Sequence, residues 1–272
     1  MTAHATEIRM LEIGNNRPAV EVWEAGQGSP LIFLHGAGGL MPNDRFFQAL
    51  AGQFHVHAPL LPGYGDSLGE ELLVDMLDAT LHTGDVIDAL GLDGPTLVGH
   101  SMGGMLAAEL AALAPNDVGQ LALIAPAGLW LDAHPVEDLF AKLPFELPEL
   151  LFHDTALGEK LLAAGLDLDD PAFLADFLVI RARRLGMAGK LLFPIPDRGL
   201  SRRLHRIKAK TLILWGESDR LIKPVYGEAF ATAITNSELQ LVPEAGHLVT
   251  HEKPAIVVDA IAAWFNASSG AR

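Results

Sequence analysis

Ser101 lies at the centre of the stretch Gly99-His100-Ser101-Met102-Gly103, which has the Gly-x-Ser-x-Gly spacing of an exposed serine nucleophile. A serine hydroxyl is a weak nucleophile at neutral pH, so it needs a base, access to substrate and donors for the oxyanion that forms. The pattern alone arises by chance in many sequences, so the flanking elements decide its meaning. A short apolar strand before it and a small-residue helix after it predict that Ser101 is a catalytic nucleophile.

Two backbone N–H groups near this serine are candidates for an oxyanion hole. Met102 directly follows the nucleophile, at the positive end of the predicted helix. The second donor is expected from the loop His35-Gly36-Ala37-Gly38-Gly39, which follows an apolar strand. We assign it to Ala37, with Gly38 as the reserve, and a simple glycine-rich turn is the alternative interpretation. Losing one such donor typically costs about 10²–10³ in rate.

A base and an acid must complete the site, and after a nucleophile elbow the acid is expected to precede the base along the chain. His247, in the loop after the last predicted strand, is the predicted base, and His251 is the alternative. Asp219 follows the preceding strand and is the predicted acid, whereas Glu217 lies too close to the strand end. Residues 125–128, the loop after the predicted strand 121–124, contain no carboxylate. Ser101, His247 and Asp219 together predict nucleophilic acyl-transfer chemistry.

Four further histidines are interpreted as structural. His35 and His100 flank the predicted site, and each is expected to tie loop backbone together through a hydrogen bond. His55 and His57 lie two residues apart on one predicted strand and therefore face the same side. No carboxylate in the local sequence joins that pair, so a metal-ligand role is the less favoured interpretation. Neither a metal nor another cofactor is expected.

Strands that alternate with helices predict the frame that holds these residues. The alternation indicates an α/β fold with a mostly parallel eight-stranded sheet flanked by helices. The predicted nucleophile, acid and base all follow strands, so they are expected at the carboxyl edge of the sheet. The predicted strands are 7–13, 19–23, 31–34, 54–61, 95–99, 121–124, 211–215 and 239–242, and the predicted core helices are 70–90, 102–113 and 254–265.

The segment 126–208 interrupts this alternation. It is rich in helix formers and contains several prolines, but no convincing buried strand. The patterns predict short helices over 140–152, 157–166 and 171–185. We interpret 126–208 as a helical cap inserted into an α/β core formed by 1–125 and 209–272.

Composition narrows the classes of partner. The chain has 272 residues, no cysteine and a formal net charge of −15. The absence of cysteine excludes disulfides and thiolate chemistry, and the negative charge argues against nucleic acid or anionic lipid. The apolar runs are shorter than a membrane span, and no secretory signal pattern opens the sequence, so a cytoplasmic location is expected. The expected partner is a small-molecule substrate, with a homodimer left open.

These residues together resemble the α/β-hydrolase superfamily in its cap-bearing branch of esterases, lactonases and carbon–carbon bond hydrolases. The matching positions extend over nearly the whole chain: His35-Gly36, Pro62-Gly63-Tyr64-Gly65-Asp66-Ser67, Gly99 to Gly104, Trp215-Gly216 with Asp219, and Gly246-His247 with Glu252 and Pro254. The resemblance implies the α/β-hydrolase fold with an inserted helical cap, a Ser-His-Asp triad and nucleophilic chemistry. It does not specify the substrate.

Departures from particular branches narrow the expected reaction. The branches that use an aspartate nucleophile are excluded because Ser101 occupies that place. The carbon–carbon bond hydrolases usually carry a tryptophan after the catalytic histidine, where this chain has Leu248. Those enzymes also hold a substrate carboxylate with a cap arginine, for which Arg181, Arg183 and Arg184 are candidates, although a solvated helix face is the alternative.

Hydrolysis of a small carboxylic ester or lactone is therefore the leading hypothesis. The alternatives are a carbon–carbon bond hydrolase acting on a ring-fission dienoate, and a cofactor-free perhydrolase or lyase. A non-enzymatic binding protein would be expected to lack a triad residue, and none is missing here.

Overall fold

One mixed sheet of eight strands organises the described part of the chain, in the order β1-β2-β4-β3-β5-β6-β7-β8. The structure is a computed structural model and describes residues 4–14, 16–41, 44–167 and 169–269. β1–β2 and β2–β4 pair antiparallel, and the other neighbours pair parallel. The predicted fold class is confirmed. The strands are β1 Glu7–Leu11, β2 Val20–Ala25, β3 Pro30–Leu34, β4 His55–Pro59, β5 Thr96–His100, β6 Gln120–Ile124, β7 Lys210–Gly216 and β8 Ser237–Val242.

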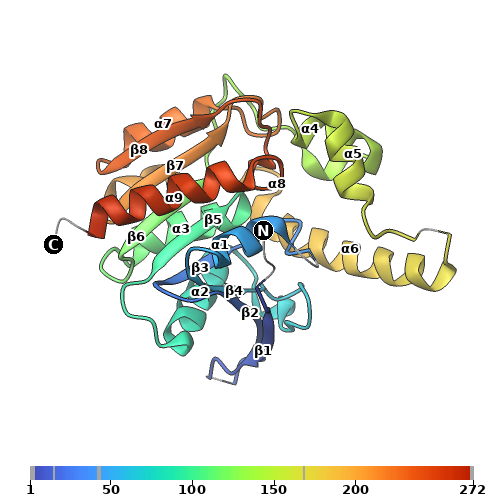
Figure 1. The fold of residues 1–272 in the computed structure, drawn as a ribbon, viewed down its shortest axis with the longest axis horizontal. Helices are drawn as coiled ribbons and strands as arrows, with labels where there is room; N and C mark the ends of the chain where they lie inside the picture. The colour runs from blue at the N-terminus through green and yellow to red at the C-terminus, as the bar shows by residue number, and fades with distance from the viewer. Residues whose placement is uncertain (1–3, 15, 42–43, 168, 270–272) are drawn as a thin grey trace.

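Helices cover both faces of the sheet (Figure 1). α2 (Met76–Leu90) packs on α3 (Met102–Leu113), and α1 (Arg45–Ala51) packs on α9 (Pro254–Ser269). Every residue of β5 and β6 is buried, because a parallel strand in the middle of such a sheet has helices on both sides. This explains why these strands read as continuous apolar runs in the sequence.

Between β6 and β7 the described residues contain helices and turns but no strand. Figure 1 shows α4 (Leu147–Leu151), α5 (Thr155–Ala163) and α6 (Pro171–Leu192) together on one side of the molecule, with α6 extending beyond the core. α6 is one turn or more longer than predicted. The predicted helix over 140–152 is instead two short 3₁₀ turns followed by α4, because prolines at 144 and 148 fit only the first turn of a helix.

The predicted helix over 70–90 is also divided. Glu70–Leu72 forms a 3₁₀ turn, and α2 begins at Met76. Asp75 causes this start, because its carboxylate accepts hydrogen bonds from the N–H groups of Leu77 and Asp78 at 2.9 and 3.0 Å. The helix therefore begins where its first N–H groups find a cap.

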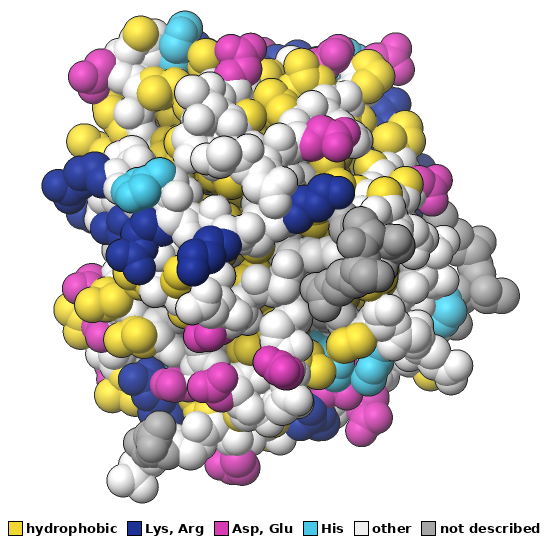
Figure 2. All heavy atoms as spheres, turned by 90° about the vertical axis from the view of Figure 1, so that its left-hand side faces the viewer, with side chains coloured by type: hydrophobic (Ala, Val, Ile, Leu, Met, Phe, Trp, Pro, Cys, Tyr) yellow, Lys and Arg dark blue, Asp and Glu magenta, His cyan; other side chains and the backbone are white. Residues whose placement is uncertain are grey.

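Acidic and basic side chains are mixed on the face of the molecule drawn in Figure 2. Several basic side chains gather at one edge of this face, and others lie scattered among acidic and hydrophobic side chains. Among the described residues, no helix has the length and apolar character needed to cross a membrane.

Candidate active site

Ser101 stands at a sharp turn between β5 and α3. Its backbone has φ 54° and ψ −115°, a conformation that costs a residue with a side chain about 1–3 kcal/mol. Two hydrogen bonds to the neighbouring strand region hold the turn: the Ser101 N–H donates to the Ile124 carbonyl at 2.9 Å, and the Ala127 N–H donates to the Ser101 carbonyl at 3.0 Å. The strain is maintained by the sheet, and it lifts the hydroxyl above the strand end.

The glycines that frame Ser101 are required by close backbone approach. A Cβ atom on Gly103 would collide with the backbone carbonyl of Leu34, and one on Gly99 would collide with that of Gly103. Helix α3 can therefore start directly against the ends of β3 and β5. The Gly-x-Ser-x-Gly spacing thus follows from packing as well as from the turn.

His247 and Asp219 complete a continuous hydrogen-bonded chain with Ser101. His247 Nε2 lies 2.9 Å from Ser101 Oγ, and His247 Nδ1 lies 2.8 Å from Asp219 Oδ2. All three side chains are buried, with no residue more than 7% exposed. A carboxylate can only accept, so Nδ1 carries the proton and Nε2 is free to accept the serine proton. The loops after β5, β7 and β8 supply the three residues.

Asp219 is held independently of the histidine. Its Oδ1 accepts hydrogen bonds from the backbone N–H groups of Leu221 and Ile222, at 3.0 and 2.9 Å. Oδ2 is therefore left to face His247. The two carboxylate oxygens have separate roles: one fixes the turn and the other fixes the imidazole.

The alternative acid and base lie elsewhere. His251 Nε2 is 3.9 Å from Asp44 Oδ2, and its Nδ1 is 3.1 Å from the Thr250 hydroxyl. Glu217 is exposed to solvent. The structure brings neither residue to Ser101.

The loop after β3 is locked by His35. The Gly36 carbonyl accepts hydrogen bonds from His35 Nδ1 at 2.8 Å and from the Gly39 N–H at 3.0 Å. His35 Nε2 accepts the Leu61 N–H at 3.2 Å, which requires the proton on Nδ1. Burial lowers the pKa of His35 to about 4, so this neutral tautomer persists at neutral pH. Because the Gly36 carbonyl is fixed, the N–H of Ala37 in the same peptide unit is fixed on the opposite side.

This loop lies directly against the serine. A Cβ placed on Gly36 would meet Ser101 Cβ at 3.4 Å. Met102 is the first residue of α3, so its N–H has no acceptor within the helix. Each predicted oxyanion donor is therefore next to backbone at the nucleophile: Met102 directly follows Ser101, and Ala37 directly follows Gly36.

His100 fixes the backbone of the predicted base through a hydrogen bond. Its Nε2 lies 3.0 Å from the His247 carbonyl, to which it donates, and the rings are 5.3 Å apart. Burial lowers the pKa of His100 to about 3, and the neighbouring His247 adds to this effect. His100 therefore stays neutral and fixes the backbone of the loop that carries the base.

A model of the alpha/beta hydrolase family matches residues 31–260. The chain belongs to this family. Its relatives include 2-hydroxy-6-oxo-6-phenylhexa-2,4-dienoate hydrolases from Burkholderia cepacia, 28% identical over 258 residues and 87% of each chain, and from Comamonas testosteroni, 29% identical over 255 residues and 85% of each chain. The chain is a hydrolase of the alpha/beta hydrolase superfamily.

The fold is shared more widely still. A crystal structure of a membrane phospholipase A matches this structure with a TM-score of 0.76 at 23% identity, covering 99% of this chain and 88% of the other. At that identity the likeness concerns the fold alone.

Glu252 joins the alpha/beta hydrolase core to the segment between β6 and β7, a role that the sequence did not reveal. Its Oε2 accepts the Gly246 N–H at 2.6 Å, directly before the base. Its Oε1 accepts the N–H groups of His153 and Asp154 at 2.9 and 3.1 Å, at the start of α5. One carboxylate therefore fixes the loop of His247 and the turn between α4 and α5. The only sequence signal was its place in the matching segment after Gly246-His247.

Tyr64 is a second residue whose role the sequence left unassigned. Its hydroxyl lies 3.0 Å from the Ala37 carbonyl and 3.2 Å from the Arg184 carbonyl, so it connects the loop after β3 to α6. The ring is buried and packs 4.4 Å from the ring of His35. Burial raises the pKa of Tyr64, so the phenol remains a donor.

The three candidate arginines of α6 are separated by the structure. Arg183 pairs with Glu70 through contacts of 3.0 and 3.2 Å. Arg184 turns toward the loop after β3, where its Nη1 donates to the Gly38 carbonyl at 3.3 Å. Among the described residues, none accepts a hydrogen bond from its buried Nε. Arg184 therefore reaches the loop that carries Ala37, one of the two predicted oxyanion donors.

Proposed function

We propose that this chain hydrolyses a small carboxylic ester or lactone through an acyl-enzyme on Ser101. The observation that supports this best is the continuous chain from Ser101 Oγ to His247 Nε2 at 2.9 Å and from His247 Nδ1 to Asp219 Oδ2 at 2.8 Å. Such an arrangement raises the nucleophilicity of a serine without a cofactor.

In the first half of the reaction, Ser101 Oγ attacks the carbonyl carbon while His247 Nε2 takes the hydroxyl proton. The carbonyl oxygen becomes an oxyanion and accepts hydrogen bonds from the N–H groups of Ala37 and Met102. Asp219 stabilises the imidazolium that forms. The C–O bond to the leaving group then breaks, and His247 returns the proton to the departing alkoxide oxygen.

In the second half, His247 removes a proton from water as the water oxygen attacks the acyl carbon. The same N–H groups hold the second oxyanion. The bond to Ser101 Oγ breaks, the serine recovers its proton from His247, and the carboxylic acid leaves. For a lactone, acid and alcohol remain in one product.

We also propose that 126–208 acts as a cap over a core of 1–125 and 209–272. Support comes from the Glu252 contacts that anchor the α4–α5 turn and from the Tyr64 contact with α6. In this arrangement the cap would shape the substrate pocket. Glu252 lies close to the proposed base in the sequence, and the Tyr64 hydroxyl contacts the carbonyl of Ala37, a proposed oxyanion donor.

A second candidate, carbon–carbon bond hydrolysis of a ring-fission dienoate, is favoured by the two dienoate hydrolases among the relatives and by Arg184. A guanidinium with an unpartnered buried Nε, beside the loop after β3, is suited to hold a substrate carboxylate. Leu248 after the base weighs against this candidate.

A substrate panel separates the two. Purified protein is assayed with p-nitrophenyl acetate and butyrate, simple lactones and a ring-fission dienoate. Ester or lactone turnover that is lost in Ser101→Ala and kept in Ser201→Ala, an exposed serine, supports the first proposal. Activity confined to the dienoate, or a perhydrolase or lyase product, refutes it.

Arg184→Met tests the second candidate on the same panel. Loss of a carboxylate grip should raise KM for the dienoate by about 10-fold or more and leave neutral esters unchanged. Arg183→Met is the matched control, because Arg183 is already paired with Glu70. An equal effect of Arg184→Met on charged and neutral substrates would reject the carboxylate grip.

A further inference from the structure

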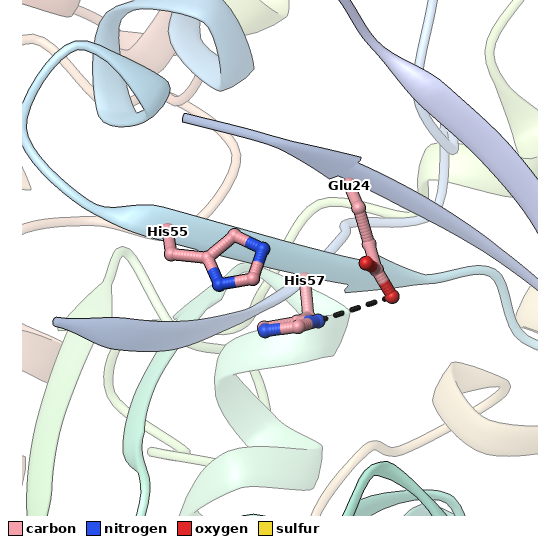
Figure 3. A group of neighbouring side chains, drawn as sticks. All are labelled: Glu24, His55 and His57. Atoms are coloured by element: carbon pink, nitrogen blue, oxygen red, sulfur yellow. Dashed lines mark ion pairs between the residues drawn. The ribbon is translucent and has the colours of Figure 1, made fainter. Parts of the chain in front are cut away.

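Three potential metal ligands meet on one face of the antiparallel edge of the sheet (Figure 3). His55 and His57 are two residues apart on β4, so their side chains share a face. Glu24 lies directly opposite His57 on β2 in the antiparallel register. One nitrogen or oxygen from each of the three side chains lies within 4.8 Å of the others. The neighbouring strand thus supplies the carboxylate that the local sequence of the histidine pair lacks.

The histidine at the centre of this cluster has an unsatisfied nitrogen. His57 is 7% exposed, and none of the described residues makes a hydrogen bond to its buried Nδ1. That atom faces Glu24 Oε1 at 3.2 Å, in ion-pair range but without hydrogen-bond geometry. The rings of His55 and His57 lie 4.3 Å apart. His57 Nδ1 and the Glu24 carboxylate therefore already face each other as two ligands of one bound cation would.

A positive charge already occupies the position beside this cluster. Arg9 on β1 donates to Glu24 Oε1 from Nε at 2.8 Å and from Nη2 at 2.5 Å. The Arg9 side chain is 36% exposed, so it can turn away into solvent. The Glu24 carboxylate therefore attracts a cation. When no other cation is bound, the Arg9 guanidinium pairs with it.

We propose that Glu24, His55 and His57 form a binding site for a transition-metal ion of the Zn²⁺ type. Two imidazoles and one carboxylate suit zinc and its neighbours, whereas Ca²⁺ and Mg²⁺ prefer oxygen ligands throughout. Three protein ligands leave a fourth position for water. A bound ion would link β2 to β4, and it would replace Arg9 of β1 as the cation beside Glu24.

The site is separate from the proposed hydrolytic chemistry. His55 begins β4 and pairs with Pro30 at the start of β3, whereas Ser101 follows the end of the parallel strand β5. The cluster therefore lies toward the amino ends of the parallel strands and Ser101 at their carboxyl ends. The ion is expected to stabilise the sheet edge and to take no part in acyl transfer.

The test measures metal binding directly on the full chain. Protein stripped with EDTA is titrated with Zn²⁺ by calorimetry and with Co²⁺ by visible absorption, which reports a low-symmetry nitrogen and oxygen site. We expect one ion per chain, with binding weakened at least about 10-fold by His57→Gln or Glu24→Gln. His134→Gln, which changes an exposed histidine, should bind as the parent does.

Arg9→Gln provides the decisive variant, because it removes the competing cation and should tighten Zn²⁺ binding at least about 3-fold. Equal binding by the parent, His57→Gln and Glu24→Gln would overturn the site and indicate an adventitious ion only. So would the absence of Zn²⁺ binding, or weaker binding by Arg9→Gln.

Discussion

The change Asp219→Asn separates the two roles of this carboxylate. Asparagine has nearly the same shape, and its side-chain oxygen can keep the hydrogen bonds from the N–H groups of Leu221 and Ile222, now 3.0 and 2.9 Å long. The amide NH₂ then takes the place of Oδ2 in front of His247 Nδ1. Because an NH₂ only donates, Nδ1 must become the acceptor and the proton must move to Nε2. In that tautomer His247 cannot take the proton of Ser101.

The two roles predict two different magnitudes. The wrong tautomer should lower kcat by about 10⁴, which corresponds to about 5.5 kcal/mol of activation free energy. The free energy of unfolding should fall by only about 1 kcal/mol, since both backbone hydrogen bonds remain. Asp219→Ala is the matched comparison: it leaves two buried N–H groups without an acceptor, at about 1–3 kcal/mol each.

The assay combines p-nitrophenyl butyrate turnover with denaturant unfolding of the parent and both variants. Turnover by Asp219→Asn within about 10-fold of the parent would refute the tautomer argument. A loss of stability in Asp219→Asn equal to that in Asp219→Ala would refute the assignment of Oδ1 to the backbone.

Three further predictions follow from the supporting residues. Gly103→Val should abolish turnover, because the added side chain collides with strand backbone. Gly186→Ala is the control and should remain active, since no atom lies within 4 Å of the added Cβ. Equal activity in the two variants would contradict the packing argument. Glu252→Ala should lower kcat about 10²-fold with little change in KM, because the loop of the base loses its anchor, and an unchanged kcat in steady-state kinetics would reject that role. The free energy of unfolding should fall by about 2 kcal/mol for each of His35 and His100 between pH 7.5 and about pH 5. Burial lowers the pKa of these residues in the folded chain to about 4 and about 3, below the ordinary 6.5. In this pH range the unfolded chain therefore binds protons that the folded chain does not bind. Denaturant unfolding across this range checks it, and a flat profile would contradict the neutral buried state.

The sheet could be predicted from the sequence because its central strands are buried on both faces. β5 and β6 are continuous apolar runs for that reason, and the helix Met102–Leu113 was predicted with the bounds that the structure has. Helix ends set by a single side chain or proline were harder to predict. Asp75 starts α2 several residues after the periodic pattern begins, and prolines divide the predicted helix over 140–152.

The proposed triad could be predicted because each member follows a strand in a short loop, so that chain order alone places it at one edge of the sheet. Contacts between segments that are far apart in the sequence could not be predicted. Glu252 reaches the turn before α5 across 99 and 98 residues, and Arg184 reaches the loop after β3 across 146. Glu24 meets His57 only because β2 pairs with β4, which no local pattern reveals.

The central claim, that Ser101 is the nucleophile, is tested most directly by covalent labelling that needs no knowledge of the substrate. The protein is treated with a fluorophosphonate, and the adduct is counted by intact mass and located by peptide mapping. We expect one adduct per chain on Ser101, absent from Ser101→Ala and formed far more slowly in His247→Ala. No adduct, an adduct on another serine, or undiminished labelling of Ser101→Ala would contradict it.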